Sequence, residues 1–131
     1  MACFLVPVTE AVVTTAVQHL VHKRELSRAS GATAADTASS PIPFSQKLGW
    51  LNKLLWGGSA LLAFEHVWHG EVVPWFPFLT AAANPEDAQE MLHEMATNGV
   101  AMALLVTAVW AAMLVVSAVL SRREAVPAPA K

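Results

Sequence analysis

The chain has 131 residues, of which 55% are hydrophobic and 14% charged, with a mean hydropathy of +0.46 and a formal net charge of −2. A soluble domain of this size needs more polar surface to cover its core, so the composition predicts an integral membrane protein. Cys3 is the only cysteine, which excludes a disulfide framework and any site built from several thiolates. The length suits one small domain without internal repeats.

Three apolar segments predict three helices, at about 2–26, 45–73 and 85–123. The third contains a nearly uninterrupted apolar run, longer than the roughly 20 residues that cross a hydrocarbon core. The second is also long enough to span. The first carries polar residues, and it either spans as well or lies in the membrane interface as an amphipathic helix. We therefore predict an all-α integral membrane protein with a single membrane domain over residues 1–131.

The segments between these helices differ in composition. Residues 27–43 are rich in Ala, Ser and Thr, and the tail 124–131 contains two prolines, so both are predicted to be flexible. The connection 74–84 contains two prolines within an aromatic run, which excludes a smooth helix there. We expect its aromatic side chains in the headgroup region, with a partner-docking patch as the alternative. The predicted interface belt consists of Trp50, Trp56, Trp75, Phe76 and Phe78.

Two helix starts have local signals. Ser45 is a candidate N-cap for the second helix. Asn84 followed by Pro85 and two acids is a strong start for the third, because Asn suits the N-cap and Pro the first helical position. From Pro85 to Arg123 the helix would be about 58 Å long at 1.5 Å per residue. It would exceed the bilayer core, so its first two turns are expected to extend beyond the outer face.

The charges predict an orientation. Lys and Arg occur only in the stretches 23–53 and 122–131, whereas residues 70–94 contain acids and no Lys or Arg. The positive-inside rule then places the amino terminus outside and the carboxyl terminus in the cytoplasm, in the inner membrane if the source is bacterial. No positive charge precedes the first segment, which argues against a cleaved signal peptide. The small residues at 32–38 leave such cleavage as the alternative.

Small residues on two helices predict close helix packing. On the third helix they recur every four residues, which forms a ridge that permits close approach of another helix. Two glycines on the second helix would supply the facing surface. Homo-oligomer contact through the same residues is the alternative to packing within one chain. The predicted packing residues are Gly57, Gly58, Gly99, Ala103, Thr107 and Ala111.

Acids and histidines gather at the predicted outer ends of the second and third helices. Within each helix the three residues fit an arc of about 100°. Antiparallel neighbouring helices would bring the two arcs to one level, where imidazoles and carboxylates suit a divalent metal such as Zn, Fe, Mn or Ni. The competing interpretation is a polar network in which these side chains hydrogen-bond with one another and with the lipid headgroups. Proton transfer and haem ligation are further alternatives. The residues are Glu65, His66, His69, Glu90, His93 and Glu94.

The first helix has a polar ridge with a spacing of four residues. We expect it to face the bundle interior and to hydrogen-bond with the neighbouring helices. A water-lined path and an interfacial amphipathic helix are the alternatives. The ridge consists of Glu10, Thr14, Gln18 and His22.

The pattern favours a small accessory or assembly subunit of a membrane complex. Its Glu/His cluster would bind a divalent metal or a partner protein, and its contacts would be the lipid bilayer and other membrane subunits or a second copy. The alternatives are an oligomeric transport or channel component, a membrane anchor or subunit of a redox or metallo-enzyme, and a purely structural membrane protein. No phosphate-binding loop, nucleophile elbow or paired-cysteine motif indicates an enzyme, and nothing supports nucleic-acid binding.

Overall fold

The computed structural model describes residues 2–30 and 42–124, and these residues are predominantly helical. The main elements are α1 (Leu5–Ala29), α3 (Phe44–Trp68), α4 (Pro85–Glu94) and α5 (Val100–Glu124). A 3₁₀ turn (Thr80–Ala83) precedes α4, and a π-helical turn (Met95–Gly99) joins α4 to α5. Because α4, the π-helical turn and α5 follow one another without a break, they form one long helix, and the described part of the chain has three main helices in all. Most of the predicted linker and tail, at 31–41 and 125–131, lies outside the described residues.

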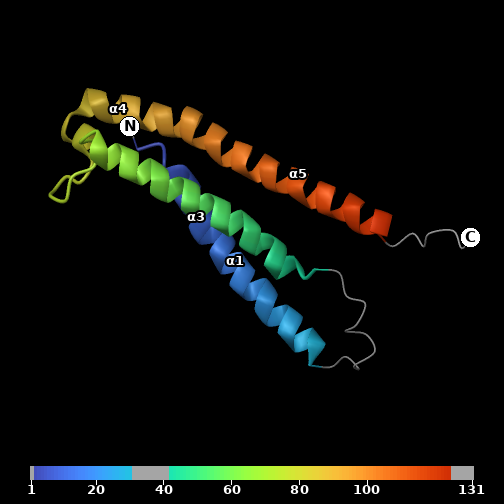
Figure 1. Ribbon diagram of the computed structural model, residues 1–131. Coiled ribbons are helices and arrows are strands. Elements are labelled where there is room, and N and C mark those ends of the chain that lie inside the picture. Colours follow the sequence, from blue (N-terminus) through green and yellow to red (C-terminus); the bar gives the residue numbers. More distant parts are fainter. Residues whose placement is uncertain (1, 31–41, 125–131) are drawn as a thin grey trace, which may run out of the picture.

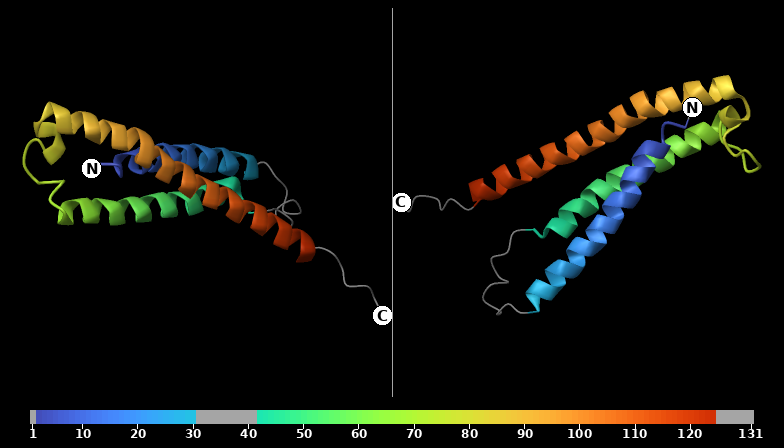
Figure 2. Two further views of the ribbon diagram at one scale, coloured as in Figure 1. Left: turned by 90° about the horizontal axis from the view of Figure 1, so that it is seen from above. Right: turned by 180° about the vertical axis from the view of Figure 1, so that it is seen from behind.

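α1 and α3 lie side by side in opposite directions, and α5 packs against both before running apart from them toward its carboxyl end (Figures 1 and 2). The start of α1, the end of α3 and α4 meet at one end of the bundle. We call this the acidic end because it carries Glu71, Glu86, Asp87 and Glu90. The end of α1 and the start of α3 form the opposite end. We call it the basic end because it carries Lys23, Arg24, Arg28 and Lys47.

Two small apolar clusters hold the helices together. In the middle of the bundle, Ala11, Leu51 and Leu55 are buried together, and the α5 residues Val106 and Trp110 pack against them. The indole N–H of Trp110 also donates to the backbone carbonyl of α3 residue Lys47, at 2.8 Å. At the acidic end, the second cluster joins the start of α1 to α4 and the segment before it. Its members are Ala2, Ala81 and Met91, with Phe4, Leu5, Leu79 and Met95 against them.

α3 ends at Trp68, five residues before the predicted boundary at 73. Gly70 has φ +71°, and its N–H donates to the carbonyl of Val67 while the N–H of Glu71 donates to that of His66. This is a Schellman motif, in which glycine adopts the left-handed conformation that closes a helix. The chain then forms a tight loop with an isolated bridge between Val72 and Leu79, so the prediction for 69–73 was wrong.

Both predicted helix starts lie within one residue of the observed ones, but of the two predicted N-caps only Asn84 is confirmed. Asn84 is the N-cap of α4, and its side chain accepts from the N–H of Glu86 with Pro85 at the first helical position. α3 instead begins at Phe44, and Ser45 lies inside it. Ser45 is not the cap because its own N–H and hydroxyl both donate to the carboxylate of Glu25, in the last turns of α1.

Among the described residues, one helix is long and apolar enough to cross a membrane: the 39-residue helix Pro85–Arg123 that combines α4, the π-helical turn and most of α5. α3 has 25 residues but contains Lys53, Glu65 and His66, which lower its hydropathy. Most large apolar side chains of α5 are exposed, including Leu104 and Val115. The length, the apolar composition and the exposed apolar side chains of this helix are therefore all those of a helix that could cross a membrane.

Candidate functional site

His66 is the one member of the predicted Glu/His cluster that is buried, with 7% of its surface exposed. Its Nδ1 donates to the carbonyl of Leu62, 2.7 Å away, one turn earlier in α3. Its Nε2 lies 3.6 Å from Sγ of Cys3 and 3.6 Å from Oε2 of Glu71. With Nδ1 as the donor, Nε2 of a neutral ring accepts a hydrogen bond from the thiol of Cys3, whereas a protonated ring would form an ion pair with Glu71. The ring of Phe4 packs edge-on against the imidazole, with centroids 5.1 Å apart.

The six predicted residues do not converge. Glu65, His69, Glu90 and His93 are exposed. Among residues 2–30 and 42–124, no three His, Cys, Asp or Glu side chains are placed to hold a metal ion together. The expected metal site is therefore not formed by the described side chains.

The predicted residues of α3 and α4 do not meet because the start of α1 and the residues just before it lie between these two helices. Phe4 contacts His66 on α3 and also packs against the cluster that contains Met91 of α4. Cys3 and Val6 come so close to Gly99 that a Cβ there would lie 2.9 Å from the carbonyl oxygen of Cys3. Sequence reasoning considered only α3 and the third helix at this point, and it missed Cys3 as the partner of His66. The 63-residue separation leaves no local signal for that contact.

Polar side chains of α1 face the other helices in the middle of the bundle. The hydroxyl of Thr107 on α5 donates to Oε1 of Glu10, at 2.5 Å. Asn52 on α3 is only 7% exposed, and it accepts from the hydroxyl of Thr14 and donates to Oε1 of Gln18. Three of the four ridge residues thus form side-chain hydrogen bonds across helix interfaces.

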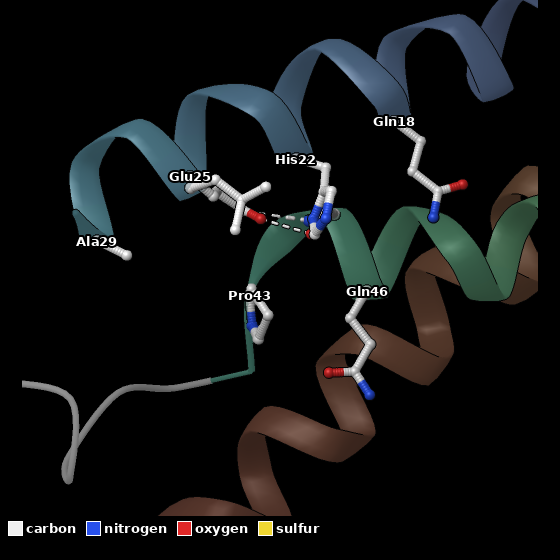
Figure 3. A pocket seen from close by; sticks show the side chains of 8 residues that line it. Gln18, His22, Glu25, Ala29, Pro43 and Gln46 are labelled. Carbon is white, nitrogen blue, oxygen red and sulfur yellow. Dashed lines mark hydrogen bonds between the residues drawn. The ribbon is translucent and has the colours of Figure 1, made fainter.

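The fourth ridge residue, His22, lines a pocket of about 410 Å³ at the basic end. Figure 3 shows His22, Gln18 and Glu25 of α1 facing the start of α3, with hydrogen bonds drawn from Glu25 to α3. The pocket is lined by Gln18, His22, Glu25, Leu26, Ala29, Pro43, Ser45 and Gln46.

Glu25 fastens α1 to the first turn of α3. It lies beyond the apolar part of the first segment, after Lys23 and Arg24. The hydrogen bond from the Ser45 hydroxyl lowers the pKa of the Glu25 carboxyl below its ordinary 4.5, and backbone N–H groups of Ser45 and Phe44 act in the same direction. The charged form is therefore the one that stabilises this contact.

We expect Glu25→Gln to lower the thermal unfolding temperature at about pH 7. Because the folded pKa is below the unfolded one, the contribution of Glu25 is complete above 4.5 and disappears as the pH falls through the folded value. The difference between the variant and the parent protein should therefore shrink in acid. Thermal unfolding in detergent, followed by circular dichroism over this pH range, measures it. Ser45→Ala should reproduce the pattern, and an undiminished difference in acid would contradict it.

The predicted packing residues fall into two groups. Gly99 and Ala103 are buried and Thr107 is half-buried, whereas Ala111 is exposed.

A Cβ added at Gly57 or Gly58 would meet nothing within 4 Å, so the surface of α3 there is open. Beside Gly58, a groove of about 220 Å³ runs between α3 and α5, and it includes Ser59, whose buried hydroxyl has no hydrogen-bond partner among the described residues.

The predicted belt residues are largely exposed. The indole N–H of Trp56 donates to the hydroxyl of Thr15, at 3.2 Å, and Trp50 is half-buried. Trp75, Phe76 and Phe78 are exposed in the loop at the acidic end.

Comparison with known proteins finds no family model, curated protein or solved structure that matches this chain.

Proposed function

We propose that the protein is a multi-pass membrane protein in which α1, α3 and α5 all span, and that it acts as an accessory or assembly subunit of a membrane complex. One observation carries the membrane part: large apolar side chains are exposed along the outer faces of α3 and α5, while a polar side chain is buried between the helices. Asn52 is 7% exposed inside, whereas Leu61 is 73% and Leu104 64% exposed outside. A surface of this kind is stable in lipid, where helices associate through small and polar residues.

The proposed orientation puts the basic end in the cytoplasm and the acidic end outside. The support is the charge distribution, with Lys23, Arg24 and Arg28 at one end and Glu71, Glu86 and Glu90 at the other. The exposed aromatic loop at the acidic end suits the headgroup region. The first two turns of the third helix would then project outward.

The open surface at Gly57 and Gly58 supports the partner-binding part of the proposal. Small residues let another helix approach closely, and the unpaired hydroxyl of Ser59 offers a hydrogen bond in the adjacent groove. A partner helix seated there would cover apolar surface of both α3 and α5. We therefore propose this surface as the contact with the rest of the complex.

A tagged full-length protein, purified from its native membrane in mild detergent, tests this function. We expect a second membrane polypeptide in fixed stoichiometry by native mass spectrometry. Gly58→Leu should release it, because the larger side chain fills the open surface. Ala108→Leu, on an exposed part of α5, is the matched control and should retain it. A parent protein that is monomeric and without a partner would contradict the proposal.

A further inference from the structure

Positive residues gather on one exposed face of α1 at the basic end. Lys23, Arg24 and Arg28, together with Leu20 and Ser27, line a surface hollow of about 380 Å³. At 100° per residue, these five positions fall within an arc of about 140°. Among the described residues, no carboxylate forms an ion pair with the three cations.

Glu25, the acid nearest to these cations along α1, contacts α3 and not the cations. Glu25 belongs to the opposite side of α1, where its carboxylate accepts from the N–H and hydroxyl of Ser45 (Figure 3). The hydroxyl of Ser27 donates to the carbonyl of Lys23, at 3.0 Å. The three cations around the hollow therefore have no carboxylate partner within the described part of the chain.

The same face of α1 is apolar over the preceding turns. Val13, Val17 and Leu20 are exposed, and at 100° per residue they share the arc of the three cations. An apolar strip thus leads directly into a cationic hollow along one side of a helix. A phospholipid with a negative headgroup has the matching order of parts, with acyl chains followed by a phosphate.

We propose that this face binds an anionic phospholipid of the cytoplasmic leaflet. Its acyl chain lies along Val13, Val17 and Leu20, and its phosphate is held by Lys23, Arg24 and Arg28. This inference rests on the proposed membrane orientation, because it needs the basic end at the cytoplasmic headgroups. The bound lipid would pack against the side of α1 that neither α3 nor α5 covers.

Native mass spectrometry of the full chain in mild detergent tests this site. The probes are phosphatidylglycerol and phosphatidylcholine with identical acyl chains. We expect the parent protein to retain phosphatidylglycerol preferentially. Each positive charge near a headgroup contributes about fivefold, so the loss of three charges in Lys23→Gln/Arg24→Gln/Arg28→Gln should reduce that preference by about a hundredfold. Arg24→Gln/Arg28→Gln, which preserves one charge, should show a smaller loss.

The control removes the same number of charges elsewhere, as Lys53→Gln/Arg122→Gln/Arg123→Gln, and should keep the preference. Equal retention of phosphatidylglycerol by the test and control variants would overturn the proposal, as would equal binding of both lipids by the parent protein. Inorganic phosphate in large excess should not displace the lipid. Displacement would show a free-phosphate site and overturn the lipid assignment.

Carbonate extraction separates this inference from the proposed function. A parent protein released from membranes by carbonate would refute membrane integration itself. A protein that stays in the membrane but fails the lipid comparison would refute only the site on α1.

Discussion

Gly99→Ala is expected to lower the free energy of unfolding by about 1–3 kcal/mol, the usual range for overpacking a tight contact. The added Cβ would lie 2.8 Å from Cγ2 of Val6 and 2.9 Å from the carbonyl oxygen of Cys3. A backbone oxygen cannot move aside as the end of a flexible side chain can, so the start of α1 must shift away. Reversible unfolding in mixed detergent micelles, followed by circular dichroism, measures the loss.

Gly58→Ala is the matched control for this prediction. The same atom is added within a helix, but nothing lies within 4 Å of it. Since alanine is favoured over glycine in helices by roughly 1 kcal/mol, this variant should be neutral or more stable than the parent protein. Equal effects at the two positions would mean that α1 does not pack against the π-helical turn as described.

Asn52→Leu is expected to destabilise the protein by about 1–3 kcal/mol, because it removes two hydrogen bonds between α1 and α3 and leaves the side-chain carbonyl of Gln18 without its donor, while Thr14 keeps only its backbone acceptors. Asn52 accepts from Thr14 and donates to Gln18 from a buried position on α3. Leucine keeps the branching of asparagine at Cγ and the same number of side-chain heavy atoms but cannot hydrogen-bond, so the variant removes both hydrogen bonds to α1. The same unfolding assay measures it.

Asn98→Leu provides the comparison for this prediction, because Asn98 is exposed in the π-helical turn. It should change stability little. If Asn52→Leu were as stable as the parent protein, the polar ridge of α1 would contribute nothing to holding the helices together.

The parts of the fold that the sequence predicted have strong local signals. The third helix starts at an Asn-Pro cap and continues through an unbroken apolar run, and both features depend only on neighbouring residues. The end of α3 also has a local signal in the sequence, Gly70, because glycine readily adopts the left-handed conformation that closes a helix. The start of α3 had no such signal, because the group that holds its first turn is Glu25, twenty residues earlier.

The candidate site could be predicted only in part, for a related reason. Helical periodicity grouped Glu65 and His69 with His66, although only His66 is buried. Its partners depend on where the start of α1 inserts, and Cys3 and Phe4 are more than sixty residues away. Tertiary packing decides such contacts, and the spacing within one helix carries no information about them.

Cysteine accessibility in intact cells tests the proposed topology most directly. In a Cys3→Ser background, Glu86→Cys would place a thiol at the exposed acidic end, and Ser121→Cys would place one near the carboxyl end of α5. We predict that a membrane-impermeant maleimide labels the first in intact cells and the second only after permeabilisation. Labelling of both in intact cells, or the reverse pattern, would contradict a multi-pass protein with its acidic end outside.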